Sequence, residues 1–230
     1  MQEKQKSAKK MKPKKPRYKH SSFRFLLILS LVFLAAGILL VFSQYYTNEK
    51  KEIHEMRYGN LLLHFRADLR KAANVPVIPS ETVVRKMLLS ENLHKVTIAL
   101  PDVKFHAGYY GAAAFELSFK LTVIYNSLYS MFSHPKVFEK ENATCLYYAD
   151  SLKEICIGKI IFSNIRELKA KKGEVIIALL GGGYANTTSV RAFPEKNLIL
   201  VEGRSVNETG RGYTDLDLAV DKLLLVLIGK

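Results

Sequence analysis

The stretch Phe25-Leu-Leu-Ile-Leu-Ser-Leu-Val-Phe-Leu-Ala-Ala-Gly-Ile-Leu-Leu-Val-Phe-Ser43 holds nineteen residues without one charged side chain. At a rise of about 1.5 Å per residue, a helix of this length spans roughly the 30 Å hydrocarbon core of a bilayer. A single segment can satisfy its backbone polar groups inside lipid only as a helix. Tyr45 and Tyr46 follow at once, where amphipathic rings favour the headgroup layer. The stretch predicts a transmembrane helix over residues 25–43; the alternative is a buried core helix.

Cations on the two sides of this segment are unequal. Residues 1–24 hold ten Lys and Arg against one Glu, whereas Lys50, Lys51 and Arg57 are mixed with acidic residues. The positive-inside rule therefore places the N-terminus in the cytoplasm and residues 49–230 outside. A cleaved signal peptide would have a shorter apolar core that ends in a small-x-small site, and Leu40-Val-Phe-Ser-Gln-Tyr45 lacks one. We expect a retained single-pass anchor in the cell membrane.

The formal charge of +14 belongs mainly to the tail before the segment. Ten cations less one anion give residues 1–24 a net +9, which leaves +5 for residues 25–230. We expect this tail to be disordered and to contact the anionic inner leaflet of the bilayer. Aromatic residues are not interleaved with its cations, so no nucleic-acid partner is expected.

Three Asn-x-Ser/Thr sequons lie beyond the segment, at Asn142, Asn186 and Asn207. All three are on the side that the charge asymmetry makes external, where glycosylation would occur. The sequence predicts a glycoprotein with these three acceptor sites.

The only two cysteines, Cys145 and Cys156, are also external in this topology, where oxidation is permitted. Two strands joined through Ala149-Asp-Ser151 would bring the sulfurs across a hairpin. We expect a disulfide; two free buried thiols are the alternative. Two thiols without a nearby His in the sequence fall short of a four-ligand metal site, so no metal is expected.

The external part is predicted to be α+β. Residues 44–79 read as an amphipathic helical stalk, with a stripe over residues 49–74, before Pro76 and Pro79 stop the helix. Ser80 can cap a second helix, and Thr214 can cap a final one that runs to residue 228. Residues 80–230 form the domain proper.

Alternating apolar residues predict strands in this domain. These strands cover residues 96–100, 103–109, 115–125, 144–149, 155–162, 174–180, 188–193 and 197–202. Residues 115–125 could instead form a helix with Leu117, Leu121 and Ile124 as its stripe. The order of elements favours a mainly antiparallel sheet with flanking helices.

The sequence patterns that could indicate catalysis or ligand binding are weak. The glycine loop of residues 180–189 lacks the Gly-Lys-Ser/Thr and the following helix of a phosphate-binding loop. Asp215, Asp217 and Asp221 could supply one or two cation ligands, but capping and solvation explain them better. The six histidines show no two-His metal spacing, and no Gly-x-Ser-x-Gly elbow occurs. The sequence thus predicts no catalytic, cofactor-binding or metal site.

We therefore expect a non-enzymatic membrane-anchored envelope protein, whose external domain binds another envelope component, such as an envelope protein, or an extracellular ligand. One alternative is a membrane-tethered hydrolase, which a cluster of two carboxylates in one pocket would favour. The other is a secretion or pilus-type assembly component.

Overall fold

The structure is a computed structural model that describes residues 34, 37, 38, 52–102, 107–129, 135–140, 143–149, 152–207 and 212–230. All but three residues of the expected anchor, the basic tail and the sequon residue Asn142 lie outside this part of the chain. Within the part that is described, no helix combines the length and the apolar character that crossing a bilayer requires. Residues from Glu52 to Lys230 belong to one compact unit.

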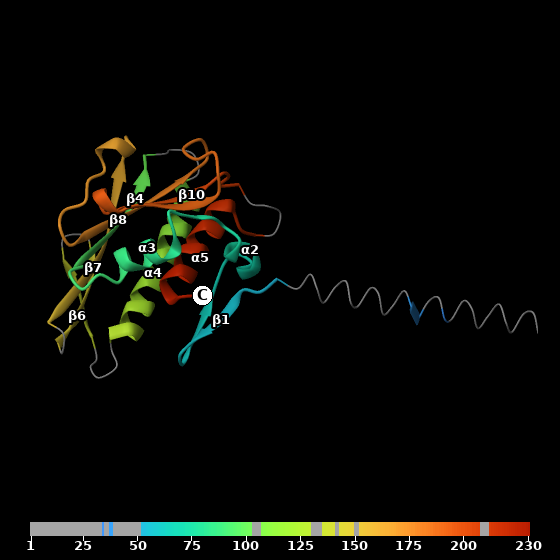
Figure 1. Ribbon diagram of the computed structural model, residues 1–230, viewed down its shortest axis with the longest axis horizontal. Coiled ribbons are helices and arrows are strands. Elements are labelled where there is room, and N and C mark those ends of the chain that lie inside the picture. The colour runs from blue at the N-terminus through green and yellow to red at the C-terminus, as the bar shows by residue number, and fades with distance from the viewer. Residues whose placement is uncertain are drawn as a thin grey trace, which may run out of the picture. The chain divides into compact units, whose positions relative to one another are not determined.

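An eight-stranded mixed sheet forms the centre of this unit (Figure 1). Its strands are, in spatial order, β3 (Val77–Ile78), β9 (Ser189–Phe193), β10 (Leu198–Gly203), β8 (Glu174–Gly181), β4 (Lys95–Pro101), β7 (Lys153–Phe162), β6 (Ala143–Tyr148) and β5 (Lys136–Lys140). The six strands expected at residues 96–100, 144–149, 155–162, 174–180, 188–193 and 197–202 are confirmed, as is the α+β class.

The expectation of a mainly antiparallel sheet is wrong. Four of the seven neighbouring pairs are parallel: β3–β9, β10–β8, β4–β8 and β4–β7. Parallel neighbours require long crossover connections. The crossover from β4 to β7 contains the helix α4 (Ala107–Tyr129), where the sequence indicated a strand instead.

The helix α4 corrects the strand expected at residues 115–125. Leu117, Leu121 and Ile124 are fully buried, so the helical stripe is the pattern that determines the structure. The period-two pattern arises because Phe115 and Phe119, on another face of the helix, are apolar but exposed. Of the strand expected at residues 103–109, residues 103–106 are not described and residues 107–109 begin α4.

A β-hairpin replaces the first half of the expected helix over residues 49–74. The strand β1 (Glu55–Tyr58) pairs with β2 (Leu61–His64), and the helix α2 is limited to Leu69–Ala73. Gly59 in the turn has a φ of +57°, a conformation that glycine adopts without steric cost. The stripe was misread because alternating residues of a short hairpin also match several helical positions.

The helices α3 (Glu81–Leu88), α4 and α5 (Asp215–Ile228) lie together on one face of the sheet (Figure 1). They bury the main core against β4, β8 and β10. The other face carries a smaller apolar cluster, including Ala178 and Leu200, packed against residues that follow β7, such as Leu168. The expected caps are confirmed: Ser80 accepts from the Val83 N–H, and Thr214 forms a capping box with Asp217.

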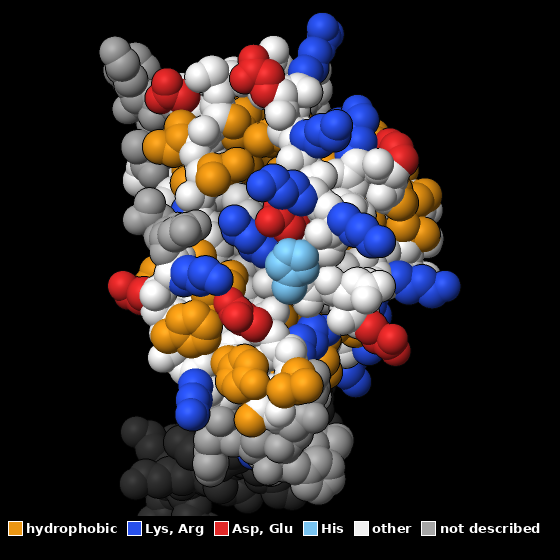
Figure 2. All heavy atoms as spheres, turned by 90° about the vertical axis from the view of Figure 1, so that its left-hand side faces the viewer, with side chains coloured by type: hydrophobic (Ala, Val, Ile, Leu, Met, Phe, Trp, Pro, Cys, Tyr) orange, Lys and Arg blue, Asp and Glu red, His pale blue; other side chains and the backbone are white. Residues whose placement is uncertain are grey.

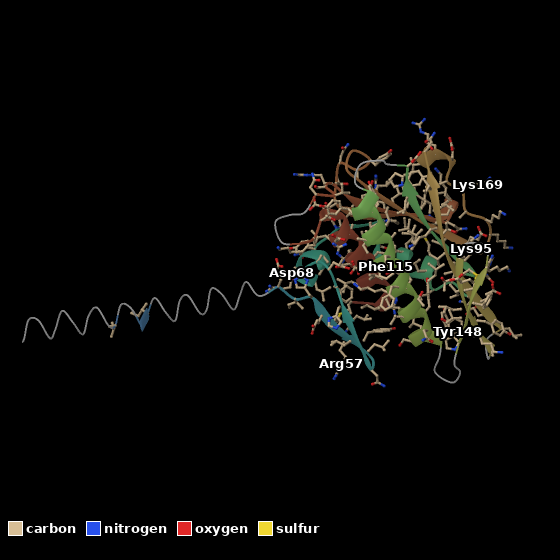
Figure 3. All side chains as sticks on the ribbon, turned by 180° about the vertical axis from the view of Figure 1, so that it is seen from behind. Arg57, Asp68, Lys95, Phe115, Tyr148 and Lys169 are labelled. Atoms are coloured by element: carbon tan, nitrogen blue, oxygen red, sulfur yellow. A yellow bond between two sulfur atoms is a disulfide. The ribbon has the colours of Figure 1, made fainter. Side chains whose placement is uncertain are left out.

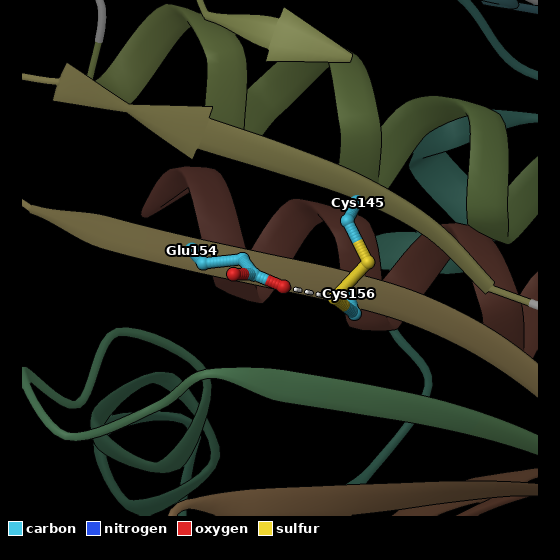
Figure 4. Close-up of a disulfide and its surroundings, with 3 residues drawn as sticks. All are labelled: Cys145, Glu154 and Cys156. Carbon is cyan, nitrogen blue, oxygen red and sulfur yellow. Dashed lines mark hydrogen bonds between the residues drawn. A yellow bond between two sulfur atoms is a disulfide. The ribbon is translucent and has the colours of Figure 1, made fainter. Parts of the chain in front are cut away.

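The expected hairpin through residues 149–151 joins β6 and β7, in antiparallel register with Cys145 opposite Cys156. The two sulfurs lie 2.02 Å apart, which is a disulfide bond (Figure 4). Both cysteines are buried.

Removing this disulfide should lower stability. Its half-cystines are 11 residues apart, and closing a loop of this size stabilises by about 3 kcal/mol in the chain-entropy model. The variant Cys145→Ala/Cys156→Ala should lose about this much free energy of unfolding. Reductant should lower the melting temperature of the natural protein and leave that of the variant unchanged. Equal melting temperatures of the natural protein with and without reductant would contradict the bond.

Gly203 should tolerate no side chain. A Cβ there would lie 2.3 Å from the Leu216 nitrogen, in the backbone of α5. Gly203→Ala should therefore destabilise by about 1–3 kcal/mol or more, measured by denaturant unfolding. Gly111 in α4 is the control, because an added Cβ meets nothing within 4 Å. Gly111→Ala should stabilise by about 0.5–1 kcal/mol, and equal effects of the two substitutions would disprove the close approach.

Candidate functional site

A groove of about 550 Å³ lies between the β1–β2 hairpin and α4. Its hairpin side is formed by β2 together with Arg66, and its helix side by six residues of α4. Figure 3 labels Phe115 on α4 and Arg57 at the hairpin. The helix side consists of Ala112, Phe115, Glu116, Phe119, Lys120 and Val123.

The wall of the groove is apolar and open to solvent. Phe115, Phe119 and Leu62 are 65%, 59% and 54% exposed. The two phenylalanine rings are stacked, with centroids 6.3 Å apart, because residues four apart meet on one helix face. Contiguous exposed apolar side chains mark binding sites more often than isolated ones do.

The floor of the groove is ionic. Glu116 is only 8% exposed, and its Oε1 accepts from the Arg66 N–H at 3.1 Å and pairs with Lys120 one turn along α4. Its Oε2 is buried without a hydrogen-bond partner, and Arg66 Nε lies 4.0 Å from it. A carboxylate oxygen with unused hydrogen-bonding capacity thus lies covered beneath the groove.

Two carboxylates of α5, Asp217 and Asp221, extend this group of charged side chains into the core, and the group is called the cluster below. Arg66 Nη1 lies 3.5 Å from Asp217 Oδ1, and Lys120 Nζ lies 3.7 Å from Asp221 Oδ1. The Ala67 N–H donates to Asp221 Oδ2 at 2.9 Å. Lys120 also lies over the Phe65 ring, 4.1 Å from its centroid, so its charge is surrounded on several sides.

Asp221 is the most strongly perturbed carboxyl of this cluster. Complete burial raises its pKa well above 3.8, the nearby Glu116 and Asp217 raise it further, and Lys120 and the Ala67 N–H oppose the shift. Burial thus favours the protonated form of Asp221. Arg66 faces Asp217 and Lys120 faces Glu116, so each cation of the cluster lies beside a carboxylate.

The residues singled out from the sequence are not at this groove, with the exception of the two aspartates beneath it. Solvation was the wrong explanation for Asp217 and Asp221, because both are buried; capping is confirmed for Asp217. Asn186 and Asn207 are exposed, and their glycosylation stays a prediction. The glycine loop leads into β9, a strand, so the feature that excluded a phosphate-binding loop is confirmed.

A second hollow, of about 330 Å³, lies near the disulfide. His94, Lys95, Glu154 and Glu174 line it with both signs of charge. Figure 2 shows a molecular face on which one histidine is surrounded mainly by Lys and Arg side chains. Among the residues that the structure describes, Cys145, Glu154 and Cys156 form a group of metal-type donors, but the disulfide occupies both sulfurs. This hollow lacks the apolar wall of the groove.

Sequence reasoning missed the groove because its residues were assigned to a strand and a stalk. The signal was present in the Phe115/Phe119 and Glu116/Lys120 pairs, each at a spacing of four. On a helix these pairs define two neighbouring faces, one apolar and one ionic.

The raised pKa of Asp221 should make stability depend on pH. An unfolded aspartate releases its proton near pH 3.8, whereas the folded protein holds it to a higher pH. The free energy of unfolding therefore falls as pH rises from about 4 toward the raised pKa. Asp221→Asn removes this titration, so its melting temperature relative to the natural protein should increase with pH over that range. Ile124→Val, a purely apolar core change, should give a curve parallel to that of the natural protein. A parallel curve for Asp221→Asn as well would refute the raised pKa.

Comparisons with protein-family models, curated proteins and solved structures found no match. The role of the groove and its floor therefore follows from the residues that line them. A largely apolar concave site of 300–1,000 Å³ with a few convergent polar groups is the usual form of a small-molecule site. The groove between hairpin and α4 has this form, and it is the candidate functional site of the chain.

Proposed function

We propose that this chain is a single-pass membrane-anchored protein whose external domain binds an amphiphile of the membrane in the groove between the hairpin and α4. The observation that carries the proposal is the stacked, exposed pair Phe115 and Phe119 above a buried ionic floor. In this view the bound envelope component is a lipid-class molecule, with its chain along the aromatic wall and its head at Glu116.

The length of chain between anchor and groove supports this occupant. The hairpin begins at Glu55, twelve residues after Ser43, the last residue of the expected anchor. An extended chain reaches about 3.3–3.6 Å per residue, so this connection spans at most about 40 Å. A domain tethered this closely samples the membrane surface continually.

The size of the groove favours a small amphiphile over a folded partner. A volume of about 550 Å³ falls within the range of ligand pockets. Stable protein–protein interfaces bury about 1,200–2,000 Å² in total, which is far more than three exposed apolar side chains provide. No contact among the described residues favours the assembly-component alternative.

One observation favours a membrane-tethered hydrolase as a second candidate. Glu116 and Asp221 are two interacting carboxyls, and burial raises the pKa of Asp221; acid–base enzymes use carboxyls in such contrasting environments. Asp221, however, is 0% exposed and reaches the groove only through Lys120 and Glu116. Turnover of an ester or glycoside by the full-length protein that Glu116→Gln abolished would establish the enzyme instead.

Photocrosslinking in membranes tests the binding proposal. The full-length protein is reconstituted into phosphatidylcholine vesicles that contain a long-chain alcohol with a diazirine on its alkyl chain. We expect adducts on residues 25–43, from the bilayer, and on α4 and β2, from the groove. Phe115→Ser/Phe119→Ser should reduce the α4 adducts at least about tenfold, because burying each ring contributes roughly 1.5–3 kcal/mol.

The matched control is Ile161→Ser, which removes another exposed apolar side chain, 73% exposed on β7. It should leave the α4 adducts unchanged. Adducts on residues 25–43 without any on α4 or β2 would overturn the binding proposal, and adducts on neither would overturn the anchor. Crosslinks from α4 to residues 25–43 or to a second copy would identify the chain itself as the occupant.

A further inference from the structure

We infer that the groove selects amphiphiles with a neutral hydroxyl head over those with an ammonium or carboxylate head. This inference rests on the proposed function, because it names the class of ligand for the same groove. It follows from the chemistry of the floor, independently of what forms the wall.

The gap between Glu116 and Arg66 defines the head-group position. Glu116 Oε2 and Arg66 Nε are 4.0 Å apart, which is too far for a direct hydrogen bond. Polar atoms at this separation are commonly bridged by a third group that bonds to both. That group must donate to the carboxylate oxygen and accept from the guanidinium.

A hydroxyl satisfies both requirements, because it carries one donor hydrogen and two acceptor lone pairs. An ammonium offers donors only, and it would add a positive charge between Arg66 and Lys120. A carboxylate offers acceptors only, and it would be placed against Glu116. Each charged head therefore satisfies one side of the gap, and it both leaves the other side without a hydrogen bond and repels it.

The pairing of charges in the cluster also favours a neutral head group. Glu116 pairs with Lys120, Arg66 lies near Asp217, and burial raises the pKa of Asp221 well above its usual value. A charged head would disturb this pairing in a buried site, where unpaired charge is costly. A neutral head leaves it intact.

The route to the gap passes Arg66. Glu116 Oε2 is itself covered, whereas the Arg66 side chain is 32% exposed and bonded to Glu116 only across the long gap. Entry then requires the guanidinium to rotate, which would change its 3.5 Å spacing to Asp217 Oδ1 but leave the backbone bond from Arg66 N–H to Glu116 Oε1 in place. A hydroxyl is small enough to enter by this movement.

The test compares three diazirine probes that share one alkyl chain and differ only in their heads: alcohol, primary amine and carboxylate. Each is presented to the full-length protein in phosphatidylcholine vesicles, and α4 adducts are divided by adducts on residues 25–43. This ratio corrects for unequal partition into the bilayer. The alcohol should exceed both charged probes by about tenfold, since hydrogen bonds to charged groups are among the stronger ones.

Glu116→Gln tests the residue assigned to this selection. It removes the negative charge that excludes a carboxylate, so the alcohol preference over the carboxylate should disappear and the carboxylate ratio should rise, whereas the amine, which still faces Arg66 and Lys120, should stay disfavoured. Glu202→Gln is the matched control, because Glu202 is a buried carboxylate paired with Arg191 on the opposite face of the sheet. It should lose comparable stability and retain the alcohol preference.

The outcomes separate the two proposals. No α4 adducts with any probe would overturn the binding function itself. Equal α4 ratios for all three heads would leave the groove as a binding site and overturn its head-group selection. A preference that Glu116→Gln does not change, in a variant whose unfolding shows that it is folded, would assign the selection to another group and also overturn the inference.

Discussion

The buried charge of Lys120 is the constraint on which the arrangement of the helices and the hairpin depends. Lys120 is almost fully buried, so its ammonium must be surrounded by partners from several elements. Glu116 comes from its own helix, Asp221 from α5 and the Phe65 ring from the segment after β2. A shift of α5 would take Asp221 away from that charge, and a shift of the residues after the hairpin would take away the Phe65 ring, so that Glu116 alone would face it. Removing one partner of such a cluster typically costs about 3–5 kcal/mol.

The same cluster explains why the hairpin packs where it does. β1 and β2 form only a two-stranded sheet, which is marginal by itself in water. The N–H groups of Arg66 and Ala67, directly after β2, donate to Glu116 and Asp221. These bonds connect the end of the hairpin to α4 and α5, and they leave the outer surface of β2 facing Phe115 and Phe119. The groove is thus a consequence of satisfying buried carboxylates.

Local patterns predicted much of the fold, and long-range pairing decided the rest. The six confirmed strands, both helix caps and the cysteine hairpin all depend on neighbouring residues. The direction of the central strands depends instead on α4, and Phe115 and Phe119 concealed that helix by giving it an alternating pattern. A helix is recognised in a sequence by apolar residues on its buried face and polar residues on its exposed face. Phe115 and Phe119 depart from this pattern because they are exposed where they line the groove. The helix that was wrongly predicted as a strand therefore forms one side of the candidate site.

The candidate site could not be predicted because its polar half is assembled from three distant segments. Arg66 and Glu116 are 50 residues apart, and Ala67 and Asp221 are 154 residues apart. The three charged residues among them, Arg66, Glu116 and Asp221, each resemble a solvated surface charge when taken alone. Only packing brings them together, and burial then changes their chemistry: the pKa of Asp221 is raised and Glu116 keeps one oxygen without a hydrogen bond. A fold could satisfy that oxygen internally with one hydroxyl, such as a serine near Arg66. Leaving it beneath an open apolar groove gives the polar head of an incoming molecule a partner that the chain itself does not supply.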